Sequence, residues 1–408
     1  MASSAGVQAV GAIFDDELRV RAVQATGPVT VVTGTEGDDL LLARRGGTRA
    51  GGRPTKGADR IEGRGGDDQV DASGGDDEVF GDFASASGTD PTADYRGGND
   101  RLKGGAGNDA IWGEGPGLAM SNASFGDDWI DGGPGDDTLV GDTEGLVYGL
   151  SGGNDRIFGG AGNDVVYGDC SDSIGRVGRG GDDSLYGGFG NDLLIGDAPF
   201  VDFQGFAGND LLDGGAGDDV LIGDGALETA GSGGDRLIGG AGNDRLYGDT
   251  PLGVDFDRIA GSRSDFPNDL YYAQWGSDDF LDGGTGDDLL VGGAGSDELT
   301  GGSGDDVFLF FPTRRYESEV EIDRILDFQQ GLDKLDLTLW GLDGTVLDTD
   351  EDGRLGDGDD AVFGDGAGNL VIDLGSATGL ADPDRAVVIL EGVSNLRLDD
   401  LVPLSAAA

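Results

Sequence analysis

The sequence predicts an all-β protein: a long parallel β-solenoid with longer loops on one edge, followed by an antiparallel β-rich cap at the C-terminal end. Three observations predict this fold. Glycine makes up 84 of the 408 residues, a nine-residue pattern recurs between residues 34 and 309, and the pattern stops where the composition changes. A fixed period outweighs the overall composition, because a net charge of −54 would otherwise be typical of a disordered chain. We therefore expect an N-terminal segment over 1–33, the repeats over 34–309 and the cap over 310–408.

The repeating unit reads glycine, any residue, aspartate, any residue, apolar residue. A large apolar residue stands two positions after the aspartate in all twenty units, from Leu41 to Phe308, and a flexible glycine-rich linker has no reason to keep it. The twenty aspartates are Asp39, Asp59, Asp68, Asp77, Asp100, Asp109, Asp128, Asp137, Asp155, Asp164, Asp183, Asp192, Asp210, Asp219, Asp235, Asp244, Asp279, Asp288, Asp297 and Asp306.

Each unit predicts a very short strand that turns one apolar side chain inward, bounded by tight glycine turns. One unit cannot bury its apolar face alone, so the units are stable only as a stack. Stacking places the aspartates in rows with a spacing of about 4.8 Å. Carboxylates in rows, beside turn carbonyls, form an all-oxygen cage that suits calcium better than magnesium. We expect calcium to supply folding free energy and the calcium-free chain to be largely unfolded.

The segments GGAGNDVVY, GGPGDDTLV, GGTGDDLLV and GGSGDDVFL resemble the nonapeptide G-G-x-G-x-D-x-U-x of the repeats-in-toxin (RTX) family. The resemblance implies a calcium-binding β-roll in which these aspartates and the neighbouring glycine carbonyls are the ligands. The region after Phe308 resembles the C-terminal cap of RTX proteins, which carries a signal for type I export from Gram-negative bacteria. The resemblance therefore implies the type I secretion machinery as a partner and an extracellular location.

The spacing of the units varies in a regular way between Asp100 and Asp244. Units come in pairs nine residues apart, and each pair is followed by an insert, so one edge keeps tight turns and the other carries longer loops. Each insert opens with an acid where the plain repeat has glycine, and this acid is either an extra calcium ligand or a turn former in solvent. These acids are Asp82, Glu114, Asp142, Asp169, Asp197, Asp224 and Asp249.

Outward-facing positions of the second strand in each pair are mostly apolar. We expect the inserts, which carry Leu118, Met120, Leu146, Tyr148, Phe200, Phe203 and Phe206, to fold over this face, with a partner surface as the alternative. The longest insert, 250–275, contains Tyr271, Tyr272 and Trp275, which suit either sugar stacking or anchoring of the loop to its own scaffold.

The predicted cap contains DTDEDGRLGDGD, which matches the loop of an EF-hand. Asp348, Asp350, Asp352, Gly353 and Asp359 stand at loop positions one, three, five, six and twelve. Asp359 replaces the usual glutamate and the flanks do not read as helices. The segment is therefore either a weak calcium loop or an acidic surface turn.

Several function classes conflict with the composition. The chain has no histidine and a single cysteine, Cys170, which excludes histidine-containing zinc sites and histidine-dependent catalytic pairs within it. The strong negative charge argues against nucleic acid, and no segment predicts membrane insertion. The N-terminus lacks the features of a cleaved signal peptide.

The expectation that remains is a secreted, non-enzymatic calcium-binding protein with a structural or adhesive role, which contacts extracellular polysaccharide or a cell surface. The alternative is a secreted carbohydrate-active enzyme or accessory module that uses carboxylates on the long-edge loops.

Overall fold

The computed structural model describes most of the repeat region and the cap. The described residues are 30–34, 37–42, 54–82, 96–115, 124–143, 151–171, 173–174, 178–201, 205–225, 232–249, 276–312, 320–378 and 386–404. Residues 1–29 and the aromatic insert 250–275 lie outside them, so the predictions made for those segments stay predictions.

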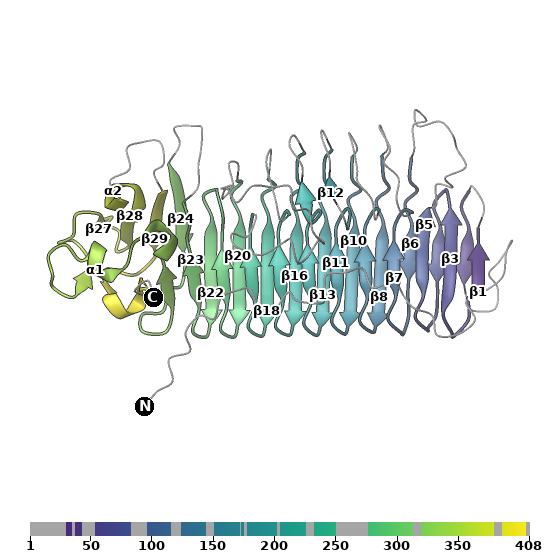
Figure 1. Ribbon diagram of the computed structural model, residues 1–408, viewed down its shortest axis with the longest axis horizontal. Coiled ribbons are helices and arrows are strands. Elements are labelled where there is room, and N and C mark those ends of the chain that lie inside the picture. Colours follow the sequence, from purple (N-terminus) through teal and green to yellow (C-terminus); the bar gives the residue numbers. More distant parts are fainter. Residues whose placement is uncertain are drawn as a thin grey trace.

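Two parallel sheets form the body of the molecule, which is an elongated stack of turns (Figure 1). The first sheet has twelve strands, in the order β1 (Thr30–Thr33), β3 (Asp59–Arg64), β5 (Glu78–Asp82), β7 (Ala110–Trp112), β9 (Thr138–Val140), β11 (Val165–Tyr167), β14 (Leu193–Ile195), β17 (Val220–Ile222), β19 (Arg245–Tyr247), β21 (Leu289–Val291), β23 (Val307–Leu309) and β25 (Lys334–Asp336).

The second sheet has fourteen strands and extends from the repeats into the cap. Its order is β2 (Leu40–Leu42), β4 (Gln69–Asp71), β6 (Arg101–Lys103), β8 (Trp129–Pro134), β10 (Arg156–Ala161), β13 (Ser184–Phe189), β16 (Leu211–Ala216), β18 (Arg236–Ala241), β20 (Phe280–Thr285), β22 (Glu298–Ser303), β24 (Glu321–Ile325), β29 (Ala386–Leu390), β28 (Leu370–Asp373) and β27 (Val362–Gly364).

Through the repeats the chain crosses from one sheet to the other with every unit, and each strand pairs with the strands one turn before and one turn after it. In β11, for example, Val166 is in register with Leu139 of β9 and Leu194 of β14. The predicted inward positions form one continuous core in which Ile157, Val166 and Leu185 are fully buried. The parallel β-roll predicted from the sequence is confirmed.

The two edges of the stack differ, as the insert spacing predicts. Tight glycine turns lie along the lower edge in Figure 1, and the strands that precede the inserts end at the opposite edge. In the tight turns backbone meets backbone: Gly162 has φ +140°, and a Cβ built on it would lie 1.9 Å from the carbonyl oxygen of Gly135. Only glycine fits such a position.

The two outer faces also differ. The outward side chains of the twelve-stranded sheet form a second buried cluster, which includes Phe80, Trp112, Tyr167 and Tyr247 at 1–4 % exposure. On the fourteen-stranded sheet, Arg101, Arg156 and Arg236 are exposed. The mostly apolar character predicted for the first face is correct. Leu118, Met120, Leu146, Tyr148 and Phe203 of the inserts lie outside the described residues.

The repeat architecture continues into the region predicted as the cap. β24 extends the second sheet in parallel with β22, and β25 extends the first in parallel with β23. Antiparallel pairing is found where β28 lies between β27 and β29, and between β26 (Arg354–Leu355) and β30 (Leu396–Arg397). A further parallel pair joins the inserts at β12 (Ser173–Ile174) and β15 (Phe200–Val201).

The helices of the described residues are short and lie in the cap. They are η2 (Thr338–Trp340), α1 (Gly344–Leu347), α2 (Leu374–Thr378) and η3 (Leu398–Asp400). Within the described part of the chain, no helix has the length and apolar character needed to cross a bilayer.

Candidate calcium sites

The repeat aspartates lie in two rows, one along each edge of the roll. In each row, Oδ1 of one aspartate accepts a hydrogen bond from the backbone N–H of the aspartate one turn earlier. Asp164 accepts from Asp137 at 2.8 Å, and Asp155 accepts from Asp128 at 2.7 Å. This bond fixes the carboxylate and uses only one of its two oxygens.

We name the rows by their edges. The long-edge row is Asp39, Asp68, Asp100, Asp128, Asp155, Asp183, Asp210, Asp235, Asp279, Asp297 and Asp323. The tight-edge row is Asp59, Asp77, Asp109, Asp137, Asp164, Asp192, Asp219, Asp244, Asp288, Asp306 and Asp333.

The second oxygen is buried and has no hydrogen-bond partner among the described residues in most members of both rows. All of these aspartates are at most 3 % exposed. They are Asp68, Asp77, Asp100, Asp109, Asp128, Asp137, Asp155, Asp164, Asp183, Asp192, Asp210, Asp219, Asp235, Asp244, Asp279, Asp288 and Asp306. A buried carboxylate oxygen without a partner is strongly unfavourable, so this pattern indicates that a cation is the missing partner.

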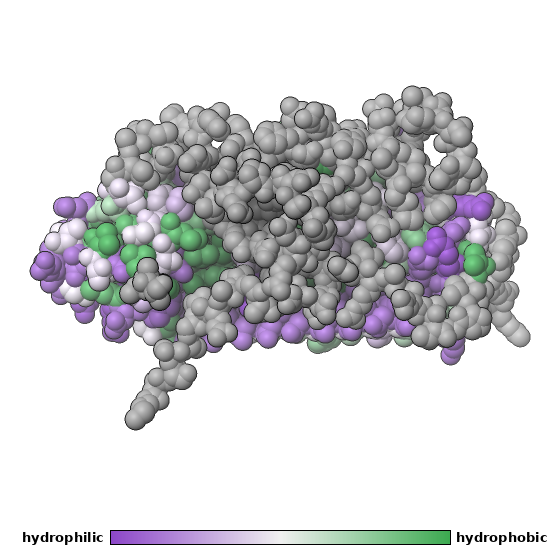
Figure 2. All heavy atoms as spheres, in the orientation of Figure 1, coloured by the Kyte–Doolittle hydropathy of each residue, from purple (hydrophilic) through white to green (hydrophobic). Residues whose placement is uncertain are grey.

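A neighbouring row in the same turns provides an internal comparison. The aspartate or asparagine that precedes most repeat aspartates also accepts a backbone N–H across turns, but it lies at the exposed rim. At the rim, asparagine serves as well as aspartate: Asn163 accepts from Asn191 at 2.8 Å and Asp136 accepts from Asn163 at 2.9 Å. Figure 2 shows hydrophilic side chains gathered along the edge that carries the tight turns.

The buried rows contain aspartate at every position. An amide oxygen would accept the same N–H, as it does at the rim, so hydrogen bonding alone does not explain the aspartate. The feature that the buried rows retain and the rim gives up is the negative charge.

Backbone carbonyl oxygens point into the same gaps as the carboxylates. A Cβ built on Gly81 would lie 1.9 Å from Oδ2 of Asp100 and 2.2 Å from the carbonyl oxygen of Gly113. The same arrangement recurs at Gly141, 2.0 Å from Oδ2 of Asp155 and 1.8 Å from the carbonyl oxygen of Gly168. Carboxylate and carbonyl oxygens at one point form the donor set that calcium takes in proteins.

Without a cation, burial favours the protonated form of these carboxyl groups. On the tight edge, burial raises the pKa of Asp164 to about 7 and that of Asp109 to about 8. On the long edge several shifts are larger: burial and then the charge of Asp128 raise the pKa of Asp100 to about 10, and burial raises the pKa of Asp128 well above its usual range, whereas that of Asp68 is raised to about 7.

The sequence missed the last member of each row and an accessory acid. Asp323 accepts from the N–H of Asp297 at 3.1 Å, Asp333 accepts from that of Asp306 at 3.3 Å, and Asp327 accepts from Gly301 and Gly302 at 2.9 Å each. Their segments, DRI and DKL, keep the aspartate and the apolar residue of the repeat but lack its glycines. The shorter pattern, an aspartate followed two residues later by an apolar residue, marks Asp323 and Asp333 but not Asp327.

The tight-edge row is closed at both ends by ordinary hydrogen bonds. Asp59 accepts from the backbone and the hydroxyl of Thr55, and Oδ2 of Asp333 accepts from the N–H of Gln329 at 2.6 Å. The carboxylates with unpartnered oxygens thus lie between these two ends.

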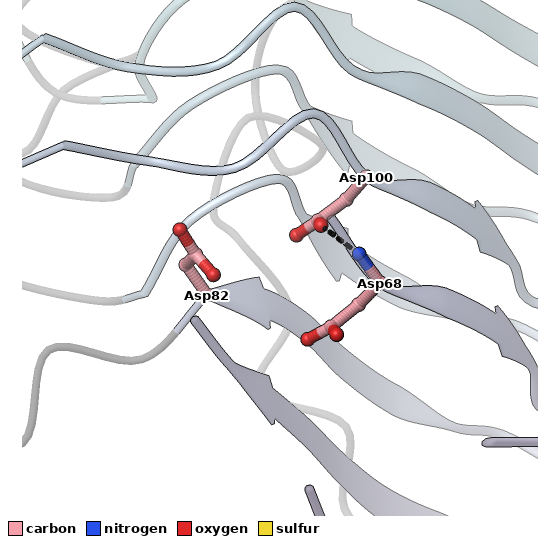
Figure 3. Close-up of side chains that lie close together, drawn as sticks. All are labelled: Asp68, Asp82 and Asp100. Carbon is pink, nitrogen blue, oxygen red and sulfur yellow. Dashed lines mark hydrogen bonds between the residues drawn. The ribbon is translucent and has the colours of Figure 1, made fainter. Parts of the chain in front are cut away.

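The insert acids, whose role the sequence left open between ligand and solvent-exposed turn former, are buried. Asp82, Glu114, Asp142 and Asp169 are 1–3 % exposed. In Figure 3, Asp82 faces Asp68 and Asp100 across a gap, and one carboxylate oxygen from each lies within 4.8 Å of the other two.

The predicted EF-hand-like loop brings its first three acids together. Asp348, Asp350 and Asp352 each place one oxygen within 4.8 Å of the others, and Gly353 has φ +83°. Asp359 is 9 % exposed and is held by the loop itself, because its Oδ1 accepts from Thr349 at 2.7 Å and its Oδ2 from Gly356 at 3.0 Å. The loop follows the four-residue helix α1, contains β26 and is followed by β27, so no EF-hand helix pair surrounds it.

Stacked parallel turns, two rows of buried carboxylates and converging carbonyl oxygens define the class of this protein, a calcium-binding parallel β-roll. The family model of the RTX calcium-binding nonapeptide repeat matches residues 55–84, 96–115, 122–143, 151–169, 177–198, 204–226, 229–250 and 276–308. Residues 55–308 therefore carry several copies of the RTX calcium-binding nonapeptide repeat. No curated protein matches the chain in sequence.

Proposed function

We propose that this protein is secreted and folds on binding calcium outside the cell, where the roll has a structural or adhesive role. The observation that carries the proposal is the pair of buried aspartate rows with unpartnered second oxygens. In this proposal the twenty repeat aspartates, together with Asp323 and the turn carbonyls, are the ligands.

The charge of the chain supports coupling between calcium binding and folding. Each row has eleven aspartates and ten gaps, and twenty calcium ions, one in each gap, would reduce the formal net charge from −54 to −14. Without the ions, the folded chain would have to bury rows of like charges in a medium of low dielectric constant. Folding free energy would therefore come from the ions.

The same coupling supports an extracellular site of action. Calcium affinities of extracellular modules lie at roughly 0.1–1 mM, a concentration that is reached outside cells. A chain that is unfolded before export and folded after it suits the type I secretion machinery expected from the C-terminal region. We propose that residues 310–408 carry that export signal, and that partners on polysaccharide or a cell surface bind the folded roll.

Circular dichroism of the purified full chain tests the proposal. In chelator the far-ultraviolet spectrum should lack β signal, and calcium at roughly 0.1–1 mM should restore it cooperatively. Magnesium should be far less effective, because it keeps its water shell and demands octahedral geometry. A chain that is already folded in chelator, or one that does not respond to calcium, contradicts the proposal.

The cap loop is the second proposed calcium site. Asp348, Asp350 and Asp352 would supply its ligands. Both oxygens of Asp359 accept hydrogen bonds from the backbone of the loop, so Asp359 would stabilise the loop and would not bind the ion directly.

A further inference from the structure

The acids that open the long inserts form a third row. Along the long edge, the N–H of Glu114 donates to the carbonyl of Asp142 at 2.8 Å, Asp142 to Asp169 at 2.9 Å, and Asp169 to Asp197 at 3.1 Å. These acids therefore recur once per turn, beside the long-edge aspartates. We call Asp82, Glu114, Asp142, Asp169, Asp197, Asp224 and Asp249 the insert row.

In most of this row the carboxylate closes the base of its own insert: one oxygen does so in Glu114, and both oxygens share the bond in Asp142, Asp169 and Asp197. Oε1 of Glu114 accepts from the N–H of Gly126 at 2.9 Å, and Oδ1 of Asp169 accepts from that of Gly181 at 3.0 Å. These glycines stand directly after the inserts, so the bond joins the start of each loop to its end. A neutral amide oxygen could accept the same hydrogen bond from the glycine N–H. This bond therefore does not explain why the residue that opens the insert is negatively charged.

In Glu114 this bond leaves the second carboxylate oxygen unused. Oε2 of Glu114 has no hydrogen-bond partner among the described residues, and Glu114 is 2 % exposed. Burial, followed by the charges of Asp128, Asp82 and Asp100, raises the pKa of Glu114 well above its usual range. Asp100 and Asp128 of the long-edge row and Asp82 of the insert row thus lie close enough to interact electrostatically with Glu114.

The separation of the oxygens fits a shared ion. Oxygens that bind one calcium at about 2.3–2.6 Å lie no more than about 5 Å apart. Asp68, Asp82 and Asp100 offer oxygens within 4.8 Å of one another (Figure 3). At Asp82, the first acid of the insert row, three acidic groups therefore surround one gap.

The tight edge cannot hold such an acid. At the matching position of the tight turn, Gly160 has φ +116°, and a Cβ built there would lie 2.1 Å from the carbonyl oxygen of Gly133. A side chain does not fit while the turn stays tight. On the long edge the chain leaves the stack at this point, and the departure makes room for a carboxylate.

We propose, resting on the proposed calcium-dependent function, that the insert row adds a third carboxylate to the long-edge calcium sites, so that the long edge fills at lower calcium concentration than the tight edge. Affinity of calcium sites rises with the number of charged ligands and with rigidity. The roll then has two classes of site, and its long edge, with the bases of its inserts, orders first as calcium rises.

Calcium titration calorimetry on the full chain tests this, with two matched variants. The first replaces four insert acids by amides, E114Q, D142N, D169N and D197N, which keep an acceptor for the glycine N–H. The second removes the same charge from exposed rim acids, D127N, D136N, D182N and D218N, each of which accepts one backbone N–H. The wild type should show two classes of site.

The insert variant should raise the calcium concentration that half-fills the tighter class by about tenfold or more, and the rim variant should change it little. If both variants behave alike, the insert acids only close loops, and this inference fails while calcium-driven folding stands. If the wild type does not bind calcium, both fail. If the fourfold variant does not fold at saturating calcium, the single variant E114Q takes its place in the titration. Only one oxygen of Glu114 accepts a hydrogen bond at the base of the insert, so E114Q can keep that bond while it loses the charge.

Discussion

At the scale of single residues, the choice between aspartate and asparagine separates two roles of a side-chain oxygen. Rim positions such as Asn163 and Asp136 need only an acceptor for a backbone N–H, and either residue serves. Buried positions such as Asp137 and Asp164 make the same kind of bond and are still always aspartate. The additional requirement is charge, which is the property that a cation recognises.

The variant D164N should therefore lose calcium without losing its hydrogen bond. The amide oxygen can still accept the N–H of Asp137, but the two gaps beside residue 164 lose a charged ligand, so we expect about two fewer ions at a given calcium concentration. Equilibrium dialysis with a calcium count measures this. D136N at the rim is the matched control, and equal losses in the two variants would contradict the assignment of Asp164 as a ligand.

A row aspartate can be predicted from the sequence only where the residues around it keep the repeat pattern. The twenty repeat aspartates were found because glycine, aspartate and the apolar residue recur together. Asp323 and Asp333 were missed because their segments take their turns from the cap and not from glycine. The burial of Glu114 could not be predicted, since an acid beside an insert looks the same in sequence whether it turns inward or outward.

At the scale of elements, the tight turn is held by close backbone contact more than by side chains. The strand β10 runs through the turn to Ala161, and the next glycine, Gly162, hydrogen-bonds through its N–H to Phe189 at 2.8 Å. The sequence predicts the glycines and the inward residue of every strand. It does not predict that, from β8 to β22, the strands ending in a tight turn are twice as long as their partners, six residues in β10 against three in β11, because that depends on pairing between turns.

The variant G162A should destabilise the calcium-loaded roll strongly. Alanine at a positive φ costs about 1–2 kcal/mol, and here the new Cβ would also lie 1.9 Å from the carbonyl oxygen of Gly135. Urea unfolding in saturating calcium gives the change in the free energy of unfolding. In the control G366A, φ is +79° and no atom lies within 4 Å, so only the backbone strain applies.

A loss in G162A no larger than that in G366A would show that the turns have room to relax. The tight packing that excludes side chains from the tight edge would then be overstated. That result would also weaken the argument that an acid fits only on the long edge.

At the scale of the whole molecule, the two sheets, the single apolar core and the aspartate rows form one cooperative array. Each turn contacts only its neighbours, so stability accumulates along the stack, and β24 and β25 continue both sheets into the cap. The array, its length and its two unlike edges could be predicted from the sequence. The join to the cap could not, because the repeat pattern fades there while the parallel pairing continues.

Protons should partly replace calcium in this array. The pKa of Asp164 in the metal-free fold is raised to about 7 and that of Asp109 to about 8, mainly by burial, whereas an aspartate in an unfolded chain titrates near 3.9. Between these values the folded chain binds more protons than the unfolded chain. The stability of the metal-free fold therefore falls as pH rises through this window, and it continues to fall above pH 8 because the pKa of Asp100 is raised to about 10.

We accordingly expect the metal-free chain to gain β structure as the pH is lowered from 8 to 5, where the row aspartates can fold in the neutral form. Circular dichroism in calcium-depleted buffer measures the transition, and saturating calcium at pH 8 gives the reference spectrum of the folded roll. The expected order is unfolded at pH 8 without calcium, and folded with either calcium or acid. A metal-free chain that stays unfolded down to pH 5 would mean that calcium does more than neutralise the rows, and that bridging of successive turns by the ion is itself required for folding.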